Sequence, residues 1–539
     1  MLKTYTFPRY AYRPSVRRPE DAVERVPVLI VGAGPVGLTA ALDCAQRGLP
    51  VVLLDDNDTV SVGSRALCYA KRTLEVWGRL GVADRLLAKG VQWQVGKVFQ
   101  GDRRVYAFDL LPEAGHRMPA MINLQQYYLE EYLVDACLQT TGVELRWKHR
   151  VTALSQQDDR VRLEVETPEG PLAIEADWVI ACDGANSSLR SMVGATFSGQ
   201  FFQDRFLIAD VLMEADFPAE RWFWFDPPFH PGQSVLLHRE ADNVWRIDFQ
   251  LGWEADPEEE KRPERVIPRI QAMLGPEARF ELEWVSVYQF ACRRIDRFRH
   301  GRVLFAGDSA HQVSPFGARG ANSGVQDVDN LGWKLQQVIA GCSPPQLLDS
   351  YHDERALAAD DNIGHSTRAT DFITPKSRAS RVLRDAVLDL AADHAFARRW
   401  VNSGRLSTPT PYLNSPLNTP DRDAFDGGLA PGSSALDAPL ERDGQRVWLL
   451  EALPSGFAVL IFGAWSGPPT LETDGLVATV LAVGDTLQDP SLEAARRYGA
   501  HTGTVYLIRP DQHVAARWHR FDATQVRAAM RRASGWMMA

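Results

Sequence analysis

The stretch that decides the fold is Val-Leu-Ile-Val-Gly-Ala-Gly-Pro-Val-Gly, residues 28–37, in which an apolar run ends in three spaced glycines. A second apolar run, LTAALDCA, follows directly, so the pattern predicts a buried strand, a tight turn and the start of a helix. Gly32 would form the turn, Gly34 would let the backbone approach a pyrophosphate, and Gly37 would let helix and strand pack closely. The helix N-terminus then offers free N–H groups to phosphate oxygens.

An acid at the end of the next apolar run completes this pattern. Residues 51–54 are Val-Val-Leu-Leu, and Asp55 follows them, 23 residues after Gly32. A carboxylate at this place binds a ribose hydroxyl in dinucleotide-binding folds. The alternative is a glycine-rich turn without a ligand, but a strand, a helix and an acid in register favour the dinucleotide site.

Two later segments again combine a buried strand with an acid. The apolar run at 178–182 ends in Asp183 and a glycine, which is a turn signal. The run at 303–306 ends in a glycine and Asp308. An acid at the carboxyl end of a strand lies where open α/β sheets bind ligands. Ordinary turn chemistry explains each segment when it is taken alone.

A glycine-rich turn, Pro-Phe-Gly-Ala-Arg-Gly-Ala-Asn at residues 315–322, follows the last of these acids. It precedes a long helix that we expect over 323–339. Backbone N–H groups gathered at a helix N-terminus suit an electron-rich oxygen or ring nitrogen. The turn is therefore a candidate for part of a cofactor site.

Length and charge limit the classes of function. The chain has 539 residues, enough for two to four domains, and its net charge of −10 gives no basic face for nucleic acid. No apolar run reaches the ~18 residues that a membrane span needs. Residues 1–26 contain no apolar core, so they are not a secretory signal, and we expect an extended arm on the surface or on a partner subunit.

The six cysteines indicate neither a metal site nor a dithiol centre. No two form a Cys-x-x-Cys pair, so no metal is expected. Most lie in apolar segments, where a buried free thiol is the default. Free thiols fit the reducing cytoplasm, which is the location that we expect.

The remaining segments predict an α/β chain of several parts. Alternating apolar residues predict antiparallel strands at 206–213, 234–240 and 244–251, and other patterns predict helices at 72–82, 121–138, 346–370 and 378–401. The expected parts are an N-terminal arm (1–26), a Rossmann-like nucleotide-binding domain in two pieces (27–199 and 293–405), an antiparallel-sheet substrate domain (200–292), a linker (406–424) and a C-terminal α/β domain (425–539).

Together the three glycine-and-aspartate corners resemble one known family. The glycine motif at 32–37, Asp183 with Arg190, and Asp308 with the turn to Asn322 are similar to the single-component FAD-dependent aromatic hydroxylases, the group A flavoprotein monooxygenases. The resemblance covers about residues 27–370. It implies an FAD-binding domain with an interleaved substrate domain.

By this resemblance, one set of residues would bind FAD. The glycines would cradle the diphosphate, Asp55 would bind the adenosine ribose, and Asp183 would serve both FAD and the nicotinamide cofactor. Gln126 matches the family's Gln-x-x-x-Glu pattern better than Gln125, because Glu130 lies four residues later. The full set is Gly32, Gly34, Pro35, Val36, Gly37, Asp55, Arg65, Gln126, Asp183, Arg190, Gly307, Asp308, Pro315, Gly320, Ala321 and Asn322.

The resemblance also implies the reaction. NADH or NADPH would reduce FAD, O₂ would add to the reduced flavin, and a C4a-hydroperoxyflavin would transfer one oxygen atom to a phenolic small molecule. The protein must hold the phenol as its anion, because a free phenol of pKa ~10 is mostly protonated at pH 7. It must also exclude water from the site.

Candidates for the substrate site come from the strand-rich segment. Tyr288, in WVSVYQF, is the first choice for contacting the substrate hydroxyl, followed by His238, Arg246 and Tyr69, with Pro315 beside the flavin ring. Each could instead be an ordinary residue of its strand or turn. Some phenol hydroxylases place an acid soon after the arginine that matches Arg65, but Leu, Cys and Tyr stand here at 67–69. The phenol-activating group therefore stays open.

The C-terminal part has a resemblance of its own. The segment TVYLIRPDQHVAARW, residues 504–518, looks like the thioredoxin-like domain of the phenol and 3-(3-hydroxyphenyl)propionate hydroxylase branch. No cysteine follows Cys342, so dithiol redox chemistry is excluded there. We expect packing or homodimer formation instead.

Two other functions stay open from the sequence. A flavin-dependent halogenase would show Trp-x-Trp-x-Ile-Pro, whereas the nearest stretch here is Trp-Phe-Trp-Phe-Asp at 222–226. A flavin-binding scaffold or regulatory protein would use the C-terminal part to recruit a partner. Reduction of the bound flavin by NAD(P)H distinguishes an enzyme from a scaffold.

Overall fold

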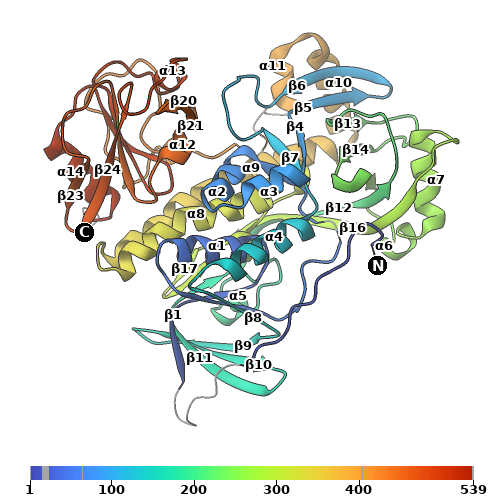
Figure 1. The fold of residues 1–539 in the computed structure, drawn as a ribbon. Coiled ribbons are helices and arrows are strands. Elements are labelled where there is room, and N and C mark those ends of the chain that lie inside the picture. Colours follow the sequence, from blue (N-terminus) through green and yellow to red (C-terminus); the bar gives the residue numbers. More distant parts are fainter. Residues whose placement is uncertain (1, 15–22, 64, 402–405, 407, 537–539) are drawn as a thin grey trace.

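The computed structural model describes residues 2–14, 23–63, 65–401, 406 and 408–536 (Figure 1). Two eight-stranded sheets lie in the larger part of the chain, and a five-stranded sheet forms the C-terminal unit. Figure 1 shows this unit, in red and dark orange, next to helix α8 (Gly320–Ile339). None of the described helices combines the length and the apolarity that crossing a bilayer requires.

The first sheet carries the glycine turn and confirms the Rossmann-like expectation. Strands β18, β11, β1, β2 and β8 run parallel in that order, and β17, β10 and β9 are antiparallel additions. Helices α1 (Pro35–Gln46) and α4 (Gln126–Gln139) pack with α8 and the sheet in one apolar core. The strands are β1 (Glu24–Val31), β2 (Val51–Asp55), β8 (Val143–Trp147), β9 (Arg150–Gln156), β10 (Val161–Thr167), β11 (Gly170–Ala181), β17 (Arg299–His300) and β18 (Val303–Phe305).

The second sheet is almost entirely antiparallel and confirms the three strands expected between 206 and 251. Its order is β19-β16-β12-β15-β14-β13-β5-β6, with β13 and β5 as the parallel pair. Strands β5 and β6 precede residue 200 by about 100 positions in the sequence. The sheet therefore includes a hairpin from outside the expected segment 200–292. The strands are β5 (Val95–Gln100), β6 (Arg103–Asp109), β12 (Phe197–Leu212), β13 (Arg221–Phe225), β14 (Ser234–Arg239), β15 (Val244–Leu251), β16 (Glu281–Ile295) and β19 (His311–Gln312).

The two faces of the second sheet differ in chemistry. One face is apolar and packs on helix α7 (Pro263–Leu274) through residues such as Ile247 and Phe249. Arg246 and Asp248, which alternate with these two residues along β15, point to the other face because side chains alternate along a strand. That polar face meets loops of the first domain, so it is the face that matters for a site.

Two expected helices are each divided in the structure. Residues 121–138 divide into strand β7 (Met121–Asn123) and helix α4, because Met121–Asn123 pairs with β3 (Cys68–Ala70) and β4 (Val91–Trp93). Residues 378–401 divide into α10 (Arg378–Asp393) and α11 (Ala395–Val401), because His394 adopts an extended conformation. The helices expected at 323–339 and 346–370 are confirmed as α8 and α9 (Asp349–Ile373).

Short elements complete the two larger parts. The segment expected as one helix at 72–82 ends earlier, and a second short helix follows it. These elements are α2 (Lys71–Arg79), α3 (Ala83–Lys89), α5 (Ser188–Met192), α6 (Pro257–Glu260) and the 3₁₀ turns Ala241–Asn243, Gly307–Ser309, Pro315–Gly317 and Pro345–Leu348.

The described part of the N-terminal arm lies on its own chain. The Tyr5 ring stacks on Tyr127 at 4.2 Å and its hydroxyl donates to Glu131, 2.7 Å away. The backbone N–H of Thr4 donates to Glu283 on β16, at 2.8 Å. The arm thus joins α4 of the first domain to the second sheet. Residues 1 and 15–22 of the expected arm lie outside the described residues.

The C-terminal unit has the sheet order β23-β24-β22-β25-β26, in which β22 and β24 are parallel and the other pairs antiparallel. Its sequence contains no cysteine. The thioredoxin-like resemblance stays a prediction. The elements are β20 (Pro439–Arg442), β21 (Gln445–Trp448), α12 (Leu449–Ala452), β22 (Phe457–Phe462), β23 (Thr470–Thr473), β24 (Leu476–Val483), α13 (Glu493–Tyr498), β25 (Val505–Ile508), β26 (Val514–Trp518) and α14 (Ala523–Ala533).

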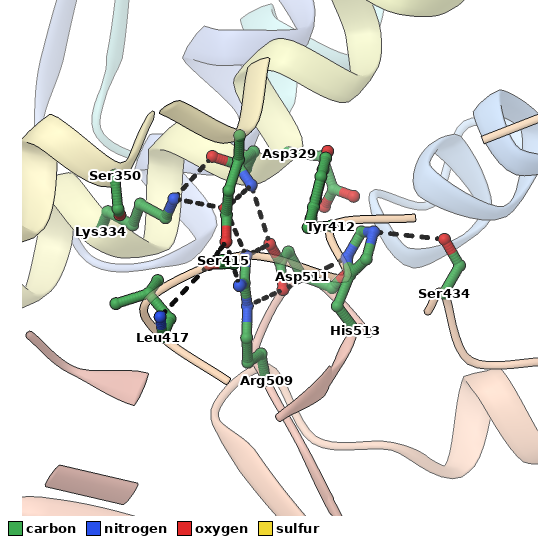
Figure 2. Close-up of polar contacts among 12 residues, drawn as sticks. Asp329, Lys334, Ser350, Tyr412, Ser415, Leu417, Ser434, Arg509, Asp511 and His513 are labelled. Atoms are coloured by element: carbon green, nitrogen blue, oxygen red, sulfur yellow. Dashed lines mark hydrogen bonds and ion pairs between the residues drawn. The ribbon is translucent and has the colours of Figure 1, made fainter. Parts of the chain in front are cut away.

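A buried ionic cluster joins the C-terminal unit to helices α8 and α9 (Figure 2). Arg509, which follows β25, donates to Glu354 on α9 at 2.6 and 2.9 Å and also pairs with Asp511. Lys334 on α8 donates to the same Glu354 at 2.7 Å. The segment expected as a linker lies against this cluster, and its Tyr412 is almost fully buried. The connection is therefore packed rather than a free tether.

Candidate active site

The glycine turn after β1 has the geometry that a diphosphate needs. Gly32 has φ +104°, and its N–H donates to the carbonyl of Leu54 at 2.8 Å. A methyl group on Gly37 would lie 1.8 Å from the carbonyl oxygen of Gly32, so only hydrogen fits there. A methyl group on Gly34 would meet no atom within 4 Å, so that side of the turn is open.

Helix α1 directs an uncapped N-terminus at this open side. Gly34 is its N-cap residue and supplies no side-chain hydrogen bond, Pro35 is its first residue, and no acid lies in its first turn. The first backbone N–H groups of a helix have no intrahelical partner, and their partial positive charge favours an anion. These observations fit the diphosphate of FAD, with Gly34, Val36 and Gly37 nearest to it.

Asp55 is held rigidly at the end of β2. One carboxylate oxygen accepts the N–H of Ala33 at 2.6 Å, and the other accepts the N–H of Asn57 at 2.8 Å. Burial raises the pKa of Asp55, and these two hydrogen bonds act against that effect. Each oxygen keeps a second lone pair that could accept a ribose hydroxyl, and the contact of Asp55 with the ribose stays a prediction.

The structure brings the three glycine-and-aspartate corners together. The Cα of Asp183 would lie 3.0 Å from a methyl group on Gly32, so the second corner touches the first. A methyl group on Gly307 would lie 3.0 Å from the side chain of Val36, so the third corner touches the first as well. Segments about 275 residues apart in sequence thus form one site.

Asp183 keeps a carboxylate oxygen free at this junction. Its Oδ2 accepts the N–H of Leu189 at 3.1 Å, whereas its Oδ1 is buried and has no hydrogen-bond partner among the described residues. Burial raises the pKa of this carboxyl. An unpartnered buried oxygen costs free energy unless something else donates to it, which fits a bound cofactor.

Asp308 lies at the third corner, beside the N-terminus of α8. Its side chain is exposed, although Gly307 and Ser309 beside it are buried, and the surrounding protein raises its pKa. His311 and Arg65 act in the opposite direction on that pKa. A methyl group on Gly320 would lie 3.9 Å from Asp308 Oδ1, so the N-terminus of α8 lies beside this carboxylate.

Gln126 holds the loop that carries Arg65. Its Oε1 accepts the N–H of Ala66 at 2.9 Å, and its Nε2 donates to Ser61 at 3.1 Å and to Glu130 at 2.7 Å. Burial raises the pKa of Glu130, whose carboxylate also accepts the N–H of Ser61. The Gln-x-x-x-Glu pattern thus orders the loop, and Arg65, whose side chain is exposed, projects from it.

We expect Gln126→Leu to weaken FAD binding about tenfold, because it leaves the Ala66 N–H without a partner and removes one hydrogen bond from the buried Glu130, at a cost of ~1–3 kcal/mol. Gln125→Leu is the matched control, since that amide binds the carbonyl of Ala241 instead. Quenching of FAD fluorescence on titration with apoprotein measures both affinities. Equal losses in the two variants would contradict this role for Gln126.

Asn322 fixes the glycine-rich turn before α8. Its Oδ1 accepts the N–H of Ala70 at 2.8 Å, and its Nδ2 donates to the carbonyls of Cys68 at 2.9 Å and Ala318 at 2.5 Å. Pro315 opens the turn and is exposed, whereas Ala321 is half-buried. Asn322 therefore joins this turn to β3, close to the Arg65 loop.

Arg190 lies at the same junction but points to backbone carbonyls. Its guanidinium donates to Ser309 at 3.3 Å and to Ala185 at 3.0 Å, and it lies 4.0 Å from the centre of the Phe197 ring. These contacts hold the second corner against the third. Its predicted contact with FAD stays a prediction.

Sequence reasoning missed a buried acid behind the third corner. Asp327 on α8 accepts the N–H of Gly307 at 2.9 Å and lies 2.6 Å from His311 and 2.7 Å from Arg355. Burial alone would raise the pKa of Asp327, but His311 and Arg355 lower it. Asp327 stands in a polar stretch of α8, between Gln326 and Val328 and before Asp329 and Asn330, so no local signal in the sequence marks it as buried.

The candidates for the substrate site separate into two groups. His238, Arg246 and Tyr288 belong to adjacent or nearby strands of the second sheet and lie on its polar face. Tyr69 does not reach this face: its ring is fully buried in the first domain, 5.3 Å from the ring of Trp77. Burial raises the pKa of Tyr69 well above its ordinary value.

Aromatic rings line part of the same face, next to the turn at 315–322 that is predicted to face the flavin. Phe206 on β12 lies opposite Tyr288, and its ring is 4.8 Å from that of Phe316 in the turn and 5.2 Å from that of Phe290. Flat apolar rings of this kind suit a planar aromatic substrate.

Comparison with known proteins gives a consistent result. The profile of the FAD binding domain family matches residues 25–366. The chain is 32% identical over 529 residues to a 6-methylpretetramide 4-monooxygenase of Streptomyces rimosus, covering 93% of this chain and 92% of that protein. It is 28% identical over 514 residues to a 3-(3-hydroxy-phenyl)propionate/3-hydroxycinnamic acid hydroxylase of Mycolicibacterium smegmatis, covering 91% and 90%.

A third relative and a solved structure agree. A probable NADH-specific resorcinol 4-hydroxylase of Rhodococcus jostii is 31% identical over 504 residues, covering 91% of each chain. The crystal structure of the flavin-dependent monooxygenase PieE with FAD and substrate superposes with a TM-score of 0.80 at 23% identity, covering 94% of this chain and 99% of that one. The family profile matches most of this chain, and the three corners form one site. This chain therefore belongs to the FAD-dependent aromatic hydroxylases, the group A flavoprotein monooxygenases.

Proposed function

We propose that this enzyme uses NADH and O₂ to hydroxylate a phenolic ring held between the polar face of the second sheet and the FAD site. The observation that carries the proposal is the convergence of the glycine turn, Asp183 and Asp308 beside the aromatic rings around Phe316. The relatives that act on hydroxyphenylpropionate and resorcinol support a phenolic substrate. NADH is preferred to NADPH because the resorcinol hydroxylase is described as NADH-specific.

FAD, when bound, would supply the reaction with O₂ and the oxygen transfer. The chain's own residues would bind and orient. The α1 N-terminus and Gly34 would hold the diphosphate, and Asp55 would hold the adenosine ribose. Asp308 and the turn at 315–322 would face the ring system, while Phe206 and Phe316 would exclude water from the substrate.

The two other functions open from the sequence have less support. The relatives described above are hydroxylases and monooxygenases rather than halogenases. The same relatives, matched over nine-tenths of the chain, favour an enzyme over a scaffold. The six cysteines are all unpaired, which supports the proposed cytoplasmic location. The homodimer stays a prediction.

The test is turnover with a panel of substituted phenols. FAD-loaded enzyme should oxidise NADH slowly alone and at least about tenfold faster with a true substrate, since ligand binding must precede efficient turnover. Mass spectrometry should find the phenol with one added oxygen atom. Matching compounds without the hydroxyl serve as controls. Stimulated NADH oxidation that yields only hydrogen peroxide with every phenol would contradict the proposal.

A further inference from the structure

A row of charged and polar side chains crosses the polar face of the second sheet. His238 on β14 lies opposite Arg246 on β15, which lies opposite Asp210 on β12. Trp222 on β13 pairs with Leu237, so the next step of this register brings Arg221 opposite His238. Because directly opposed residues share a face, Arg221, His238, Arg246 and Asp210 form one transverse row.

Arg246 is neutralised within this row. Its Nε donates to Asp248 at 2.8 Å, and its Nη1 donates to the carbonyl of Arg65 at 3.0 Å. Burial would lower its pKa, but Asp248 and Asp210 raise it above its ordinary value. Arg246 therefore positions the Arg65 loop, and its charge needs no further partner.

Arg221 is not neutralised. It is 6% exposed, and the hydrogen bond that the described residues offer it is to the carbonyl of Phe316, 3.0 Å from its Nη2. Burial lowers the pKa of this guanidinium, and Arg246 acts in the same direction, against a weaker pull from Cys68 and Asp248. Burying a cation without an ion pair costs free energy, and an anion bound next to Arg221 would offset that cost.

His238, next in the row, also lacks a partner. It is 4% exposed, its Nδ1 is buried, and neither ring nitrogen has a hydrogen bond within the described part of the chain. Burial and the cations of Arg221 and Arg246 lower its pKa well below the ordinary value. The imidazole is therefore neutral at pH 7, with one nitrogen able to donate and the other able to accept.

These two residues lie where a substrate ring would lie. The carbonyl that Arg221 contacts belongs to Phe316, one residue after Pro315 in the flavin-side turn. The Phe316 ring packs against Phe206 and Phe290. The site thus combines an aromatic wall with a buried, uncompensated cation and a neutral hydrogen-bonding imidazole.

We propose that Arg221 binds an anionic oxygen of the aromatic substrate, with His238 as the neighbouring hydrogen-bonding group. The anion is either the phenolate of the ring or a carboxylate on its side chain, since both present the same charged oxygen to a guanidinium. If it is the phenolate, the phenol O–H bond breaks on binding and the proton leaves to water. This inference rests on the proposed function, and it names a group for the phenol-activating role that the sequence left open.

A cation in contact lowers the pKa of an acid by about 1–3 units. The pKa of a phenol, ordinarily ~10, would therefore move closer to neutral pH, which favours the phenolate. The charged and titratable groups that act on Arg221, His238 and Arg246 include Cys68, Asp248, Asp210 and Glu240. Because Asp248 is occupied by Arg246, the net field at Arg221 favours an anion.

The experiment measures binding to FAD-loaded enzyme, so it does not depend on turnover. Three probes separate the two anions: 4-nitrophenol offers only a phenol, 3-phenylpropionate only a carboxylate, and 3-(3-hydroxyphenyl)propionate both. Flavin difference spectra give the affinities, and the nitrophenolate absorption gives the pKa of the bound phenol. Arg221→Met should weaken binding of the probes whose anionic oxygen Arg221 holds by about 100-fold. Arg221→Lys should weaken binding of the same probes by only about tenfold.

Arg239→Met is the matched control. Arg239 follows His238 on the same strand, so it points to the other face, where its guanidinium lies 5.6 Å from the centre of the Trp245 ring. The Arg239→Met enzyme should bind every probe as tightly as the unsubstituted enzyme does. A raised pKa of bound nitrophenol in Arg221→Met assigns the phenolate, and loss confined to the two carboxylates assigns the side chain.

Unchanged affinity of Arg221→Met for all three probes would overturn the inference. So would an equal loss of FAD and of substrate, because Arg221 would then only hold the turn at Phe316. If the enzyme binds the probes through Arg221 but hydroxylates none of the phenols in the panel, the proposed function fails and the anion site stands.

Discussion

Replacing Gly34 with valine is expected to abolish FAD binding while the apoprotein stays folded. Gly34 has φ −77° and ψ −177°, an extended conformation that any residue adopts, and its missing Cβ would meet no protein atom within 4 Å. The free energy of unfolding of the apoprotein should therefore change by less than ~1 kcal/mol. The side chain would instead fill the space that the diphosphate needs, and FAD affinity should fall at least ~100-fold, or ~2.7 kcal/mol.

Gly37→Val is the matched contrast for this prediction. Its Cβ would lie 1.8 Å from the carbonyl oxygen of Gly32, so it should prevent the strand and helix from packing and should lower stability as well as FAD binding. Circular dichroism and thermal unfolding of the two apoproteins, together with FAD titration, separate the effects. A Gly34→Val enzyme that binds FAD normally would show that the diphosphate does not pass this turn.

Breaking the ionic cluster between the domains is the second change with a large expected effect. Glu354 is 1% exposed and accepts hydrogen bonds from Arg509, Lys334, Asn330 and Ser415. Glu354→Gln removes the negative charge, so Lys334 loses its carboxylate partner and Arg509 keeps only Asp511. Loss of one member of a buried ion pair costs ~3–5 kcal/mol, so the C-terminal unit should undock or unfold at a lower temperature.

Thermal unfolding and limited proteolysis of the segment 408–420 measure this effect. Glu258→Gln is the control, because Glu258 pairs with Lys261 at the surface, where its side chain is 80% exposed and the pair contributes ~1 kcal/mol or less. An unchanged unfolding temperature in Glu354→Gln would show that the cluster does not hold the unit in place.

The same cluster predicts a pH dependence. Burial alone would raise the pKa of Glu354, but Arg509 and Lys334 lower it below its ordinary value of 4.5, and Arg509 likewise lowers that of Asp511. A lowered pKa gives stability that is present above the ordinary value and is lost as the pH falls below it. The stability difference between the unsubstituted enzyme and Glu354→Gln should thus be full at pH 7 and shrink below about pH 4.5.

Some expectations failed because pairing partners override local pattern. Residues 121–123 look helical in sequence, yet they form β7 because Cys68–Ala70 and Val91–Trp93 supply hydrogen bonds on both sides. The second sheet includes β5 and β6, which a division of the chain by composition places elsewhere. Neither result is visible in a window of neighbouring residues, since the partners lie tens to hundreds of positions away.

The sequence by itself determined the elements of the candidate FAD site. The apolar runs that end in Gly32, Asp55, Asp183 and Asp308 follow local rules of strand burial and turn formation, so their positions could be predicted without tertiary contacts. The spacing of the glycines carried the same information, because a missing Cβ matters wherever two backbones approach closely.

Only the tertiary structure decided which side chains share a site and which charges are neutralised. It placed Tyr69 in a core and His238 on the polar face, although both are aromatic residues of strands. It gave Arg246 a carboxylate and left Arg221 with a carbonyl, although both are arginines in the same sheet. The physical reason is that charge balance depends on distance in space, which strand register and domain packing set and sequence separation does not.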